Sequence, residues 1–593
     1  MFLIGLLLSF FIHPIPVFAV DEFQVNQNIQ YQIDTSGNAN VSQEIQLTNN
    51  ISQIYPKEYQ ITLSSNNIKN IVGSDSLGNI VQKIDQQSDK TIIYLKFNQA
   101  NVGKNQITKF NLNYYLPSLA TKKGNTWEIA LPENQNFSTN YSSNITILLP
   151  TSFGSLSFSS VSPQNIISLN DQTEVSINST NSQNQKILLI FGDFQLFDFE
   201  FKYFLENSKN KTSTYQIPLP PETDSQKITY RFLDPPPKNI NIDPDGNYLA
   251  QYELSPQQKI DITVNGQVKI IHSNLNKATI NPKDYLKSNQ YWPIDNPDLK
   301  TISSQLLTPK KIYDYVISTL SYKYDNFDSA TRQGADLALT NPTSALCTEF
   351  TDLFITLARI SGIPAREVQG FAYSNNIKIK PININTDVLH AWPQYYDSTK
   401  KAWISIDPTW GKTTNGIDFF NDLDPNHFAF VFHGLDSINP PPPGAYKNNQ
   451  DIKTVKVEFA KTEIKSDQVP LKISPISQNI FKNSTIKIQN PNYNSISQLQ
   501  VSIPKLNWSQ NINHLPPLSS MEINFPNIPF FKSILPQYYR LKINLQQPNS
   551  PTTTILKIKN PKYFFNLIIF SALSITFIGF GGIIFTTIKK HKK

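Results

Sequence analysis

Residues 343–350, TSALCTEF, contain Cys347, the only cysteine in a chain of 593 residues. A chain with one cysteine cannot form an internal disulfide, so this thiol is either a small buried hydrophobic group or a reactive group. Apolar residues with helical spacing follow it at Phe350, Leu353, Phe354, Leu357 and Ile360. The pattern predicts a helix that starts near Ser344 and ends at Gly362 and Pro364.

Thr343 and Ser344 are the expected N-caps of this helix, because a hydroxyl at that position accepts a hydrogen bond from a free backbone N–H group. Either choice places Cys347 in the first helical turn. Unsatisfied N–H groups and the positive end of the helix dipole favour a thiolate there. The position therefore indicates a nucleophile rather than a packing residue.

Two further residues complete a constellation with Cys347. Residues 388–396, VLHAWPQYY, and 402–407, AWISID, predict two strands around a turn at residues 397–400. If Tyr396 pairs with Lys401, His390 lies opposite Asp407 on the same face, where a carboxylate can fix the imidazole tautomer. Pro393 lacks an N–H group and predicts that its strand lies at the edge of a sheet.

These motifs resemble the core of the transglutaminase-like superfamily, a papain-like fold. The resemblance rests on CTEF at 347–350, ARISGIPAREVQG at 358–370, HAW at 390–392 and DPTWG at 407–411. It covers roughly residues 285–435, including RQGA at 332–335 and HFAF at 427–430. It implies that Cys347 is the nucleophile, that His390 is the base and acid, and that Asp407 orients the imidazole.

The same resemblance implies acyl transfer through a thioester. The thiolate attacks an amide carbonyl, His390 protonates the leaving amine or ammonia, and water or a lysine amine resolves the thioester. The Cys347 N–H group would donate to the oxyanion, with Trp392 as a candidate second donor. The chain departs from the family at Ala345, where glycine is usual, and at Gln394, where an acidic residue is frequent. Arg366 is expected to be structural.

The rest of the chain reads as β-modules with proline-rich joints. With 39% hydrophobic, 12% aromatic and 16% charged residues, the composition is not that of a disordered chain. Short strands are expected at residues 30–33, 39–42, 91–97 and 110–116, and hairpins around Asp245-Gly246 and Asn265-Gly266. Residues 499–503 and 541–545 alternate apolar and polar positions, as in a β-sandwich.

Both ends of the chain carry apolar segments. Residues 1–19 are expected to be a signal peptide, because an apolar run at residues 2–12 precedes a small-residue site. Residues 563–588 are long enough to span a bilayer, and a basic tail at residues 589–593 follows. The predicted localisation is the cell membrane, with a single pass, an outer ectodomain and a cytoplasmic C-terminus.

No other site stands out in the sequence. The net charge of +7 includes four lysines in the last five residues, so no nucleic-acid-binding surface is expected. His427 and His433 lack the further ligands that a zinc site needs. No phosphate loop or cofactor fingerprint is visible. We therefore expect no metal and no cofactor, while the oligomeric state stays open.

The sequence thus predicts a multidomain protein with an α+β papain-like transglutaminase core, flanked by N-terminal and C-terminal β-sandwiches and followed by one transmembrane helix. The expected parts are the signal peptide, an N-terminal β-sandwich region at 20–205, a small β-unit at 206–284, the catalytic domain at 285–438, a linker at 439–450, a membrane-proximal sandwich at 451–562, the helix and the tail. The expected function is a surface-anchored cysteine enzyme acting on peptide or protein amides, by hydrolysis or transfer to an amine. The alternative is an adhesion or scaffold protein with an inactive domain.

Overall fold

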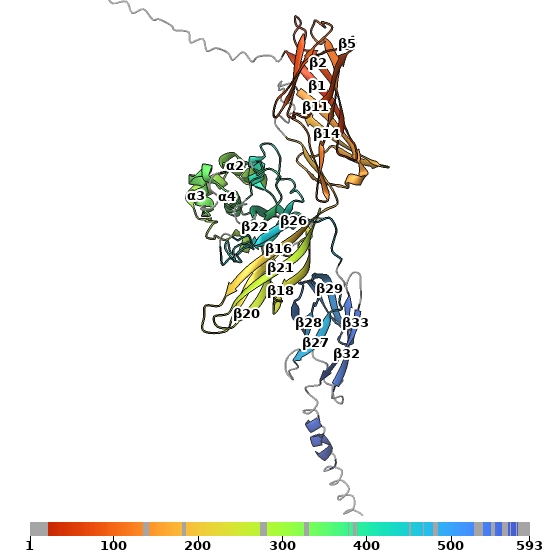
Figure 1. Cartoon of the computed structure of the whole chain (residues 1–593). Helices are drawn as coiled ribbons and strands as arrows, with labels where there is room; N and C mark the ends of the chain where they lie inside the picture. The colour runs from red at the N-terminus through yellow and green to blue at the C-terminus, as the bar shows by residue number, and fades with distance from the viewer. Residues whose placement is uncertain are drawn as a thin grey trace, which may run out of the picture. The chain divides into compact units, whose positions relative to one another are not determined.

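The computed structural model describes residues 22–133, 141–180, 186–272, 281–324, 331–377, 379–382, 387, 389–449, 452–465, 468–477, 484–526, 538–546, 552–559, 567–569, 571–576 and 578. The chain forms two compact units (Figure 1). One comprises Met1–Asp193 with Gly416–Asp418, and the other comprises Phe194–Asn415 with Phe419–Lys593.

The N-terminal unit is built from β-strands that share one hydrophobic core. An eight-stranded sheet has the order β13-β14-β11-β1-β2-β8-β4-β5, and smaller sheets have the orders β12-β15-β10-β9 and β3-β7-β6. Burial alternates along β1 and β2 because successive side chains of a strand point to opposite faces. The strand bounds are β1 Phe23–Ile33, β2 Ala39–Asn49, β3 Glu58–Leu63, β4 Lys69–Asp75, β5 Gly78–Asn79, β6 Val81–Gln86, β7 Thr91–Lys96, β8 Ile107–Leu116, β9 Ala120–Lys123, β10 Thr126–Ala130, β11 Tyr141–Pro150, β12 Leu156–Ser159, β13 Asn165–Leu169, β14 Gln172–Thr180 and β15 Leu188–Phe191.

A second group of strands begins the other unit. Its two sheets have the orders β18-β21-β16-β26 and β17-β20-β19. The strand β16, which lies largely inside the expected N-terminal region of 20–205, pairs along its whole length with β21. The strand bounds are β16 Phe194–Glu206, β17 Ser213–Leu219, β18 Gln226–Asp234, β19 Asn239–Ile242, β20 Tyr248–Leu254, β21 Lys259–Ile271 and β26 Val455–Phe459.

One of the two hairpins predicted in this group is confirmed and the other is wrong. The strands β19 and β20 pair around Gly246, whose φ is 95°. Asn265 and Gly266 instead lie inside the continuous strand β21. A Cβ at Gly266 would lie 2.7 Å from the Phe199 ring and 2.9 Å from the Thr229 carbonyl oxygen. Gly266 therefore allows two strands to approach each other closely beside a bulge and does not form a turn.

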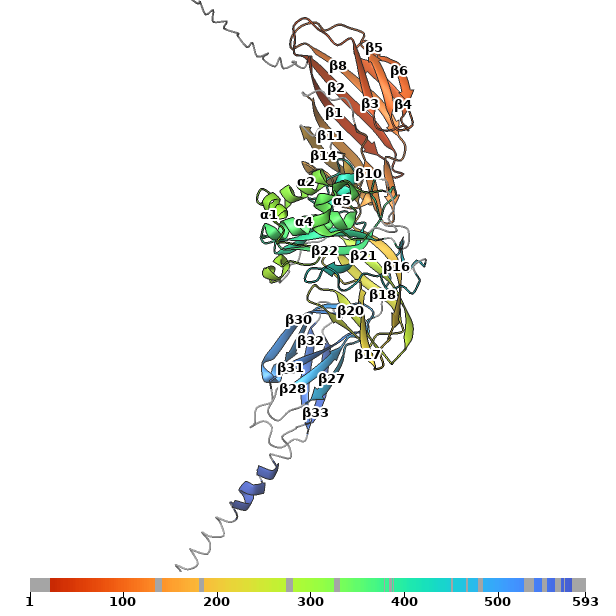
Figure 2. The same cartoon turned by 90° about the vertical axis from the view of Figure 1, so that its left-hand side faces the viewer.

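The mixed region contains a four-stranded antiparallel sheet of order β24-β23-β22-β25. Helices α1, α2, α4 and α5 gather on one side of β22 (Figure 2). Aromatic side chains of the sheet pack on the other side against β16, as in the Phe428–Phe199 ring contact at 5.4 Å. The bounds are η2 Pro282–Leu286, α1 Pro297–Ser303, α2 Pro309–Thr319, α3 Gly334–Thr340, η4 Pro342–Ser344, α4 Cys347–Ile360, β22 Ala365–Ala372, β23 His390–Asp397, β24 Ala402–Ser405, α5 Pro408–Thr413 and β25 His427–His433.

The C-terminal strands form two sheets around a separate core, with the orders β27-β28-β31 and β30-β29-β32-β33. Leu499, Val501 and Ile503 are fully buried in it, as their alternation predicts. The strand bounds are β27 Lys472–Ser477, β28 Ser484–Gln489, β29 Ile496–Ile503, β30 Trp508–Leu515, β31 Ser520–Phe525, β32 Tyr538–Gln546 and β33 Thr552–Lys559.

The two ends of the chain lie largely outside the described residues. The predicted signal segment at 1–19 and the tail at 589–593 are not among them. Within the predicted membrane span of 563–588, residues 567–569, 571–576 and 578 are described, and all of them are helical. Among the described residues, no helix combines the length and the apolar character that a membrane crossing requires.

Gly370 allows β22 and β25 to approach each other beside the candidate site. A Cβ at this position would lie 2.1 Å from the Phe428 carbonyl oxygen and 3.0 Å from the Ala429 Cα. The neighbouring atoms are backbone and cannot rotate away. We expect Gly370→Ala to lower the free energy of unfolding by about 1–3 kcal/mol or more, as overpacking does. Urea denaturation measures this change, and an unaltered midpoint would contradict it.

Candidate active site

Cys347 is the first residue of α4 and its thiol is half-buried. The N-cap is Leu346, so the predicted caps Thr343 and Ser344 are wrong. These two residues belong to the separate short helix η4, and the extended Ala345 stands between the two helices. Pro342 is the first residue of η4, a position that favours proline because it needs no N–H partner. The prediction that Cys347 lies at the start of the helix is confirmed, and the backbone N–H groups there have no intrahelical partner.

A buried carboxylate in the first turn of α4 accepts a hydrogen bond from the N-cap residue. Glu349 is 2% exposed, and its Oε2 accepts hydrogen bonds from the Leu346 N–H group (2.9 Å) and the Thr348 hydroxyl (3.1 Å). Its Oε1 accepts from the Gln333 N–H group at 2.8 Å. Glu349 therefore fixes the turn that carries the thiol and ties it to the start of α3.

His390 and Asp407 lie together, as predicted. His390 Nε2 lies 2.9 Å from Asp407 Oδ2, and both side chains are buried. His390 Nδ1 makes no hydrogen bond of normal geometry to any described residue, while the Cys347 thiol is close enough to act electrostatically on the ring. The three groups thus follow one another as thiol, imidazole and carboxylate.

The predicted register of the hairpin is wrong, because the partner of each residue of β23 lies two positions further along the chain than predicted. Tyr396 pairs with Trp403 rather than with Lys401, because the loop comprises residues 398–401 and Lys401 takes a φ of 56°. The displacement totals two positions and so keeps every side chain on its face. Asp407 is not on the strand at all. It is the N-cap of α5, where its Oδ1 accepts from the Trp410 N–H group at 3.0 Å.

The strand β23 is interior, between β24 and β22, so the prediction of an edge strand from Pro393 is also wrong. Pro393 pairs with Glu367 of β22, and its carbonyl accepts from the Ile406 N–H group at 3.1 Å. The backbone carbonyl of Pro393 thus still accepts a hydrogen bond from the segment that follows β24.

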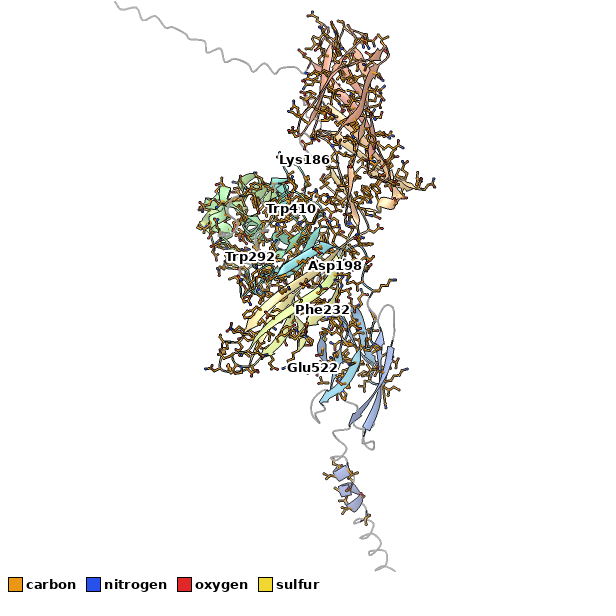
Figure 3. All side chains as sticks on the ribbon, viewed as in Figure 1. Lys186, Asp198, Phe232, Trp292, Trp410 and Glu522 are labelled. Atoms are coloured by element: carbon orange, nitrogen blue, oxygen red, sulfur yellow. The ribbon has the colours of Figure 1, made fainter. Side chains whose placement is uncertain are left out.

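Two indole rings stack on His390. The ring centroid of Trp410 lies 5.1 Å from that of the imidazole, with 23° between the planes, and Trp392 lies at 5.9 Å with 28°. Trp410 is fully buried and is labelled in Figure 3 together with Trp292 of the same domain. Aromatic faces attract cations. The surroundings therefore suit a protonated imidazole and restrict its rotation.

The electrostatics of the pair follow from burial and proximity. Burial disfavours the charged imidazole, but the charge and hydrogen bond of Asp407, with the interaction of Cys347, outweigh it and raise the pKa of His390 to about 9. Burial also opposes ionisation of Asp407, yet the two neighbouring histidines lower the pKa of that carboxyl to about 2. At neutral pH the pair is an imidazolium with a carboxylate.

This pair makes a pH-dependent contribution to stability. Because the pKa of His390 is raised from 6.5 to about 9, its contribution is present in full below pH 6.5 and is lost as the pH rises through about 9. We expect the difference in unfolding free energy between the wild type and His390→Gln to shrink over that window. Chemical denaturation at several pH values measures it. A difference that grows with pH there would contradict the assignment.

A second histidine, which the sequence analysis set aside, lies on the other side of Asp407. His427 Nε2 is 3.5 Å from Asp407 Oδ2, and His427 Nδ1 is 2.8 Å from Asp424 Oδ1. Lys380 Nζ lies 3.1 Å from Asp424 Oδ2. The only sequence signals for His427 were the DPNH spacing at 424–427 and its place at the start of a strand. The strand order β23-β22-β25, which brings His427 to Asp407, is not visible from the sequence.

The departures from the family pattern are accommodated. Ala345 is buried with φ −80° and ψ 138°, an ordinary extended conformation that needs no glycine. Gln394 Oε1 accepts from Arg366 Nε at 2.8 Å, and its amide donates to the Ser405 hydroxyl at 2.8 Å. Arg366 is 8% exposed and lies over the rings of Trp403 and Phe432. Its contacts are those of a structural residue.

His390, Asp407 and His427 also lie near enough to one another to be considered as metal ligands, with their ligating atoms within 4.8 Å. His390 Nε2 and Asp407 Oδ2 already lie 2.9 Å from each other, and His427 Nδ1 lies 2.8 Å from Asp424 Oδ1. The contacts among these groups form an acid–base chain.

Tyr322 is the phenol that acts on the thiol. It is 8% exposed and pairs with Ala345 in an isolated parallel bridge. Burial, followed by the nearby Cys347, Tyr324 and Asp407, raises the pKa of its hydroxyl above the usual range. Trp392, the second donor considered from the sequence, instead stacks on His390. Tyr322 is thus a mostly buried phenol that interacts electrostatically with Cys347.

One known protein family matches the region that contains this site. Residues 298–408 match the family model of the transglutaminase-like superfamily, a span that includes Cys347, His390 and Asp407 but ends before His427. The chain therefore carries a transglutaminase-like superfamily domain. The matched segment is a minor part of the chain, so the match describes this domain and not the β-modules.

Solved structures give weaker matches. A proposed cysteine protease from Cytophaga hutchinsonii is 16% identical over 47% of this chain and 94% of its own, with a TM-score of 0.31. The periplasmic domain of TgpA from Pseudomonas aeruginosa is 15% identical over 38% of this chain and 91% of its own, with a TM-score of 0.23. These scores are too low to support an argument about fold or activity. No curated protein sequence matches the chain.

Proposed function

We propose that the chain is a transglutaminase-like cysteine enzyme that acts on amide bonds of peptides or proteins. The observation that carries the proposal is the order of Cys347, His390 and Asp407, with a half-buried thiol at a helix N-terminus beside a buried imidazole–carboxylate pair. A scaffold role for the domain, the alternative, would require neither an accessible thiol nor this order. The partial exposure of Cys347 favours the enzyme.

The proposed reaction proceeds in two steps. The Cys347 sulfur bonds to the amide carbonyl carbon, and the C–N bond breaks as the His390 imidazolium gives its proton to the leaving amine or ammonia. His390 then takes a proton from water or from an amine, which attacks the thioester and releases the thiolate. Asp407 keeps the imidazole in place throughout through its 2.9 Å hydrogen bond.

Charge develops on the carbonyl oxygen during both steps and needs hydrogen-bond donors. The backbone N–H group of Cys347, at the start of α4, is one. The Tyr322 hydroxyl is the second in this proposal, because it interacts with Cys347 from a mostly buried position. Neither donor distinguishes hydrolysis from amine transfer, so the acceptor decides the outcome.

A direct test uses the purified full-length chain and two peptide pools, one with glutamine side chains and one without. Each pool is incubated with and without a small primary amine, and mass spectrometry follows peptide cleavage, ammonia release and amine incorporation. Turnover that is absent from Cys347→Ala supports the enzyme, and the product identifies hydrolysis or transfer. No turnover and no acyl adduct on Cys347 with any pool would favour the scaffold.

The location of the protein is a separate proposal. The apolar runs at residues 2–12 and 563–588, with the basic residues that follow the second, favour export and anchoring by one C-terminal helix. Protease treatment of intact cells tests it. Degradation of everything but a C-terminal fragment would support this orientation, and full protection would contradict it.

A further inference from the structure

Hydrogen bonds and ion pairs continue inward from Asp407 for three more residues. The sequence of buried contacts is His390 to Asp407 at 2.9 Å, Asp407 to His427 at 3.5 Å, His427 to Asp424 at 2.8 Å and Asp424 to Lys380 at 3.1 Å. The residues come from separate elements: the start of β23, the cap of α5, the start of β25, the turn before β25 and the segment after β22.

The signs of these groups alternate. His427 is 6% exposed, and burial alone would favour its neutral form. The carboxylates of Asp424 and Asp407 outweigh that effect and raise the pKa of His427 to about 9, while Lys380 and His427 hold the pKa of Asp424 well below its usual range. His390, Asp407, His427, Asp424 and Lys380 therefore form a run of cation, anion, cation, anion and cation with one positive charge in excess, while the Glu349 carboxylate lies two residues along the chain from Cys347.

We propose that His427, held by Asp424 and Lys380, is a positioning residue of the site: its imidazolium keeps Asp407 ionised and in place, so that His390 stays charged and directed at the Cys347 thiol. The inference rests on the proposed function for its biological meaning, but its test needs no substrate. His427 itself does not touch the thiol. It acts through Asp407 and through the excess positive charge.

Several ionisable groups face this run and enter any pH dependence. His427 faces Asp424, Asp407 and His390, and the imidazole ring centroids of the two histidines are 5.9 Å apart. Asp424 also faces Lys380 and interacts with Asp422. Tyr322 interacts with Cys347, Asp407 and the Glu349 carboxylate.

Removal of the His427 charge has two effects of the same sign at Cys347. The carboxyl of Asp407 loses one of the two cations that lower its pKa. The thiolate also loses a nearby positive charge that stabilises it against protonation. Both effects reduce the thiolate population at acidic pH, so the pH at which alkylation reaches half its maximum rate moves upward.

The matched control is His433, on the same strand. It is 1% exposed, and its Nδ1 lies 2.9 Å from Glu367 Oε2, so it forms the same kind of buried imidazole–carboxylate pair. Its other nitrogen contacts the Pro440 carbonyl oxygen at 2.8 Å. If buried histidines of β25 only support the fold, His427→Gln and His433→Gln will change the site alike.

The experiment measures the rate of iodoacetamide alkylation of Cys347 from pH 5 to pH 10 in the purified full-length chain. We expect His427→Gln, and equally His427→Asn, to move the half-maximal pH upward by on the order of one unit. His433→Gln should leave it unchanged. Thermal unfolding of each variant shows that it is folded.

Three results would overturn the inference. One is a His427→Gln profile that coincides with the wild type, and another is an equal shift in His433→Gln. If His427→Gln does not fold, His427→Asn decides through its own profile, and failure of both to fold would mark the run as structural. Failure of the proposed function would give a different result: the wild type would turn over no amide, whatever the alkylation profiles show.

Discussion

Replacing Cys347 with serine is expected to lower amide turnover by about 10⁴-fold or more. A serine hydroxyl in this place keeps the volume of the site but is not ionised by a neighbouring imidazolium. Cys347 is the only cysteine of the chain, so no other thiol can take over. The rate of product formation on the best peptide of the pools described above measures the loss.

The same variant also removes all alkylation by iodoacetamide, which provides an internal check of the assignment. Thermal unfolding should be close to that of the wild type, because the thiol is half-buried and at a helix start. Turnover that persists in Cys347→Ser would show that another group is the nucleophile and would remove the basis of the proposed function.

Replacing Asp407 with asparagine is expected to lower turnover by about 10²- to 10⁴-fold. The amide cannot balance the charge of the His390 imidazolium, and its orientation no longer fixes which ring nitrogen faces the thiol. Asparagine is as good an N-cap as aspartate. The start of α5 should therefore persist, and the substitution isolates the charge. The measurement is kcat on the same peptide, with circular dichroism as a test of folding.

Asp397→Asn is the matched control for this substitution. Asp397 lies on the same hairpin and caps its loop through the N–H groups of Thr399 (2.8 Å) and Lys400 (2.9 Å). It does not belong to the proposed site, so turnover should stay at the wild-type level. Equal losses in both variants would mean that the hairpin, and not the Asp407 charge, is responsible.

The three central residues of the site were identifiable from the sequence because each has its own local signal. Cys347 is unique, and it precedes a helix whose apolar spacing is regular. His390 begins β23, and Asp407 follows β24 as the N-cap of α5, so the short hairpin keeps the two residues close along the chain even though the predicted register was wrong. The two residues still meet because Asp407, as the N-cap of α5, uses Oδ1 for the Trp410 N–H group and places Oδ2 next to His390.

The missed features at His427 and at Asn265-Gly266 depend on contacts between distant segments, whereas the N-cap of α4 is set locally. His427 reaches Asp407 because β25 pairs with β22, which itself pairs with β23. Nothing in the sequence sets that strand order. The N-cap moved to Leu346 because Glu349, three residues later, supplies the acceptor. Asn265-Gly266 looked like a turn, but the ring of Phe199 needs the space that a side chain at 266 would fill.

The measurement that tests the central claim most directly is alkylation of Cys347 by iodoacetamide across pH, in the wild type and in His390→Ala. The account predicts rapid labelling at about pH 6 that slows markedly on loss of His390, because the imidazolium beside the sulfur stabilises the thiolate. Labelling only above about pH 8.5, as for an ordinary thiol, or equal rates in the two proteins, would contradict an activated nucleophile and leave the domain a scaffold.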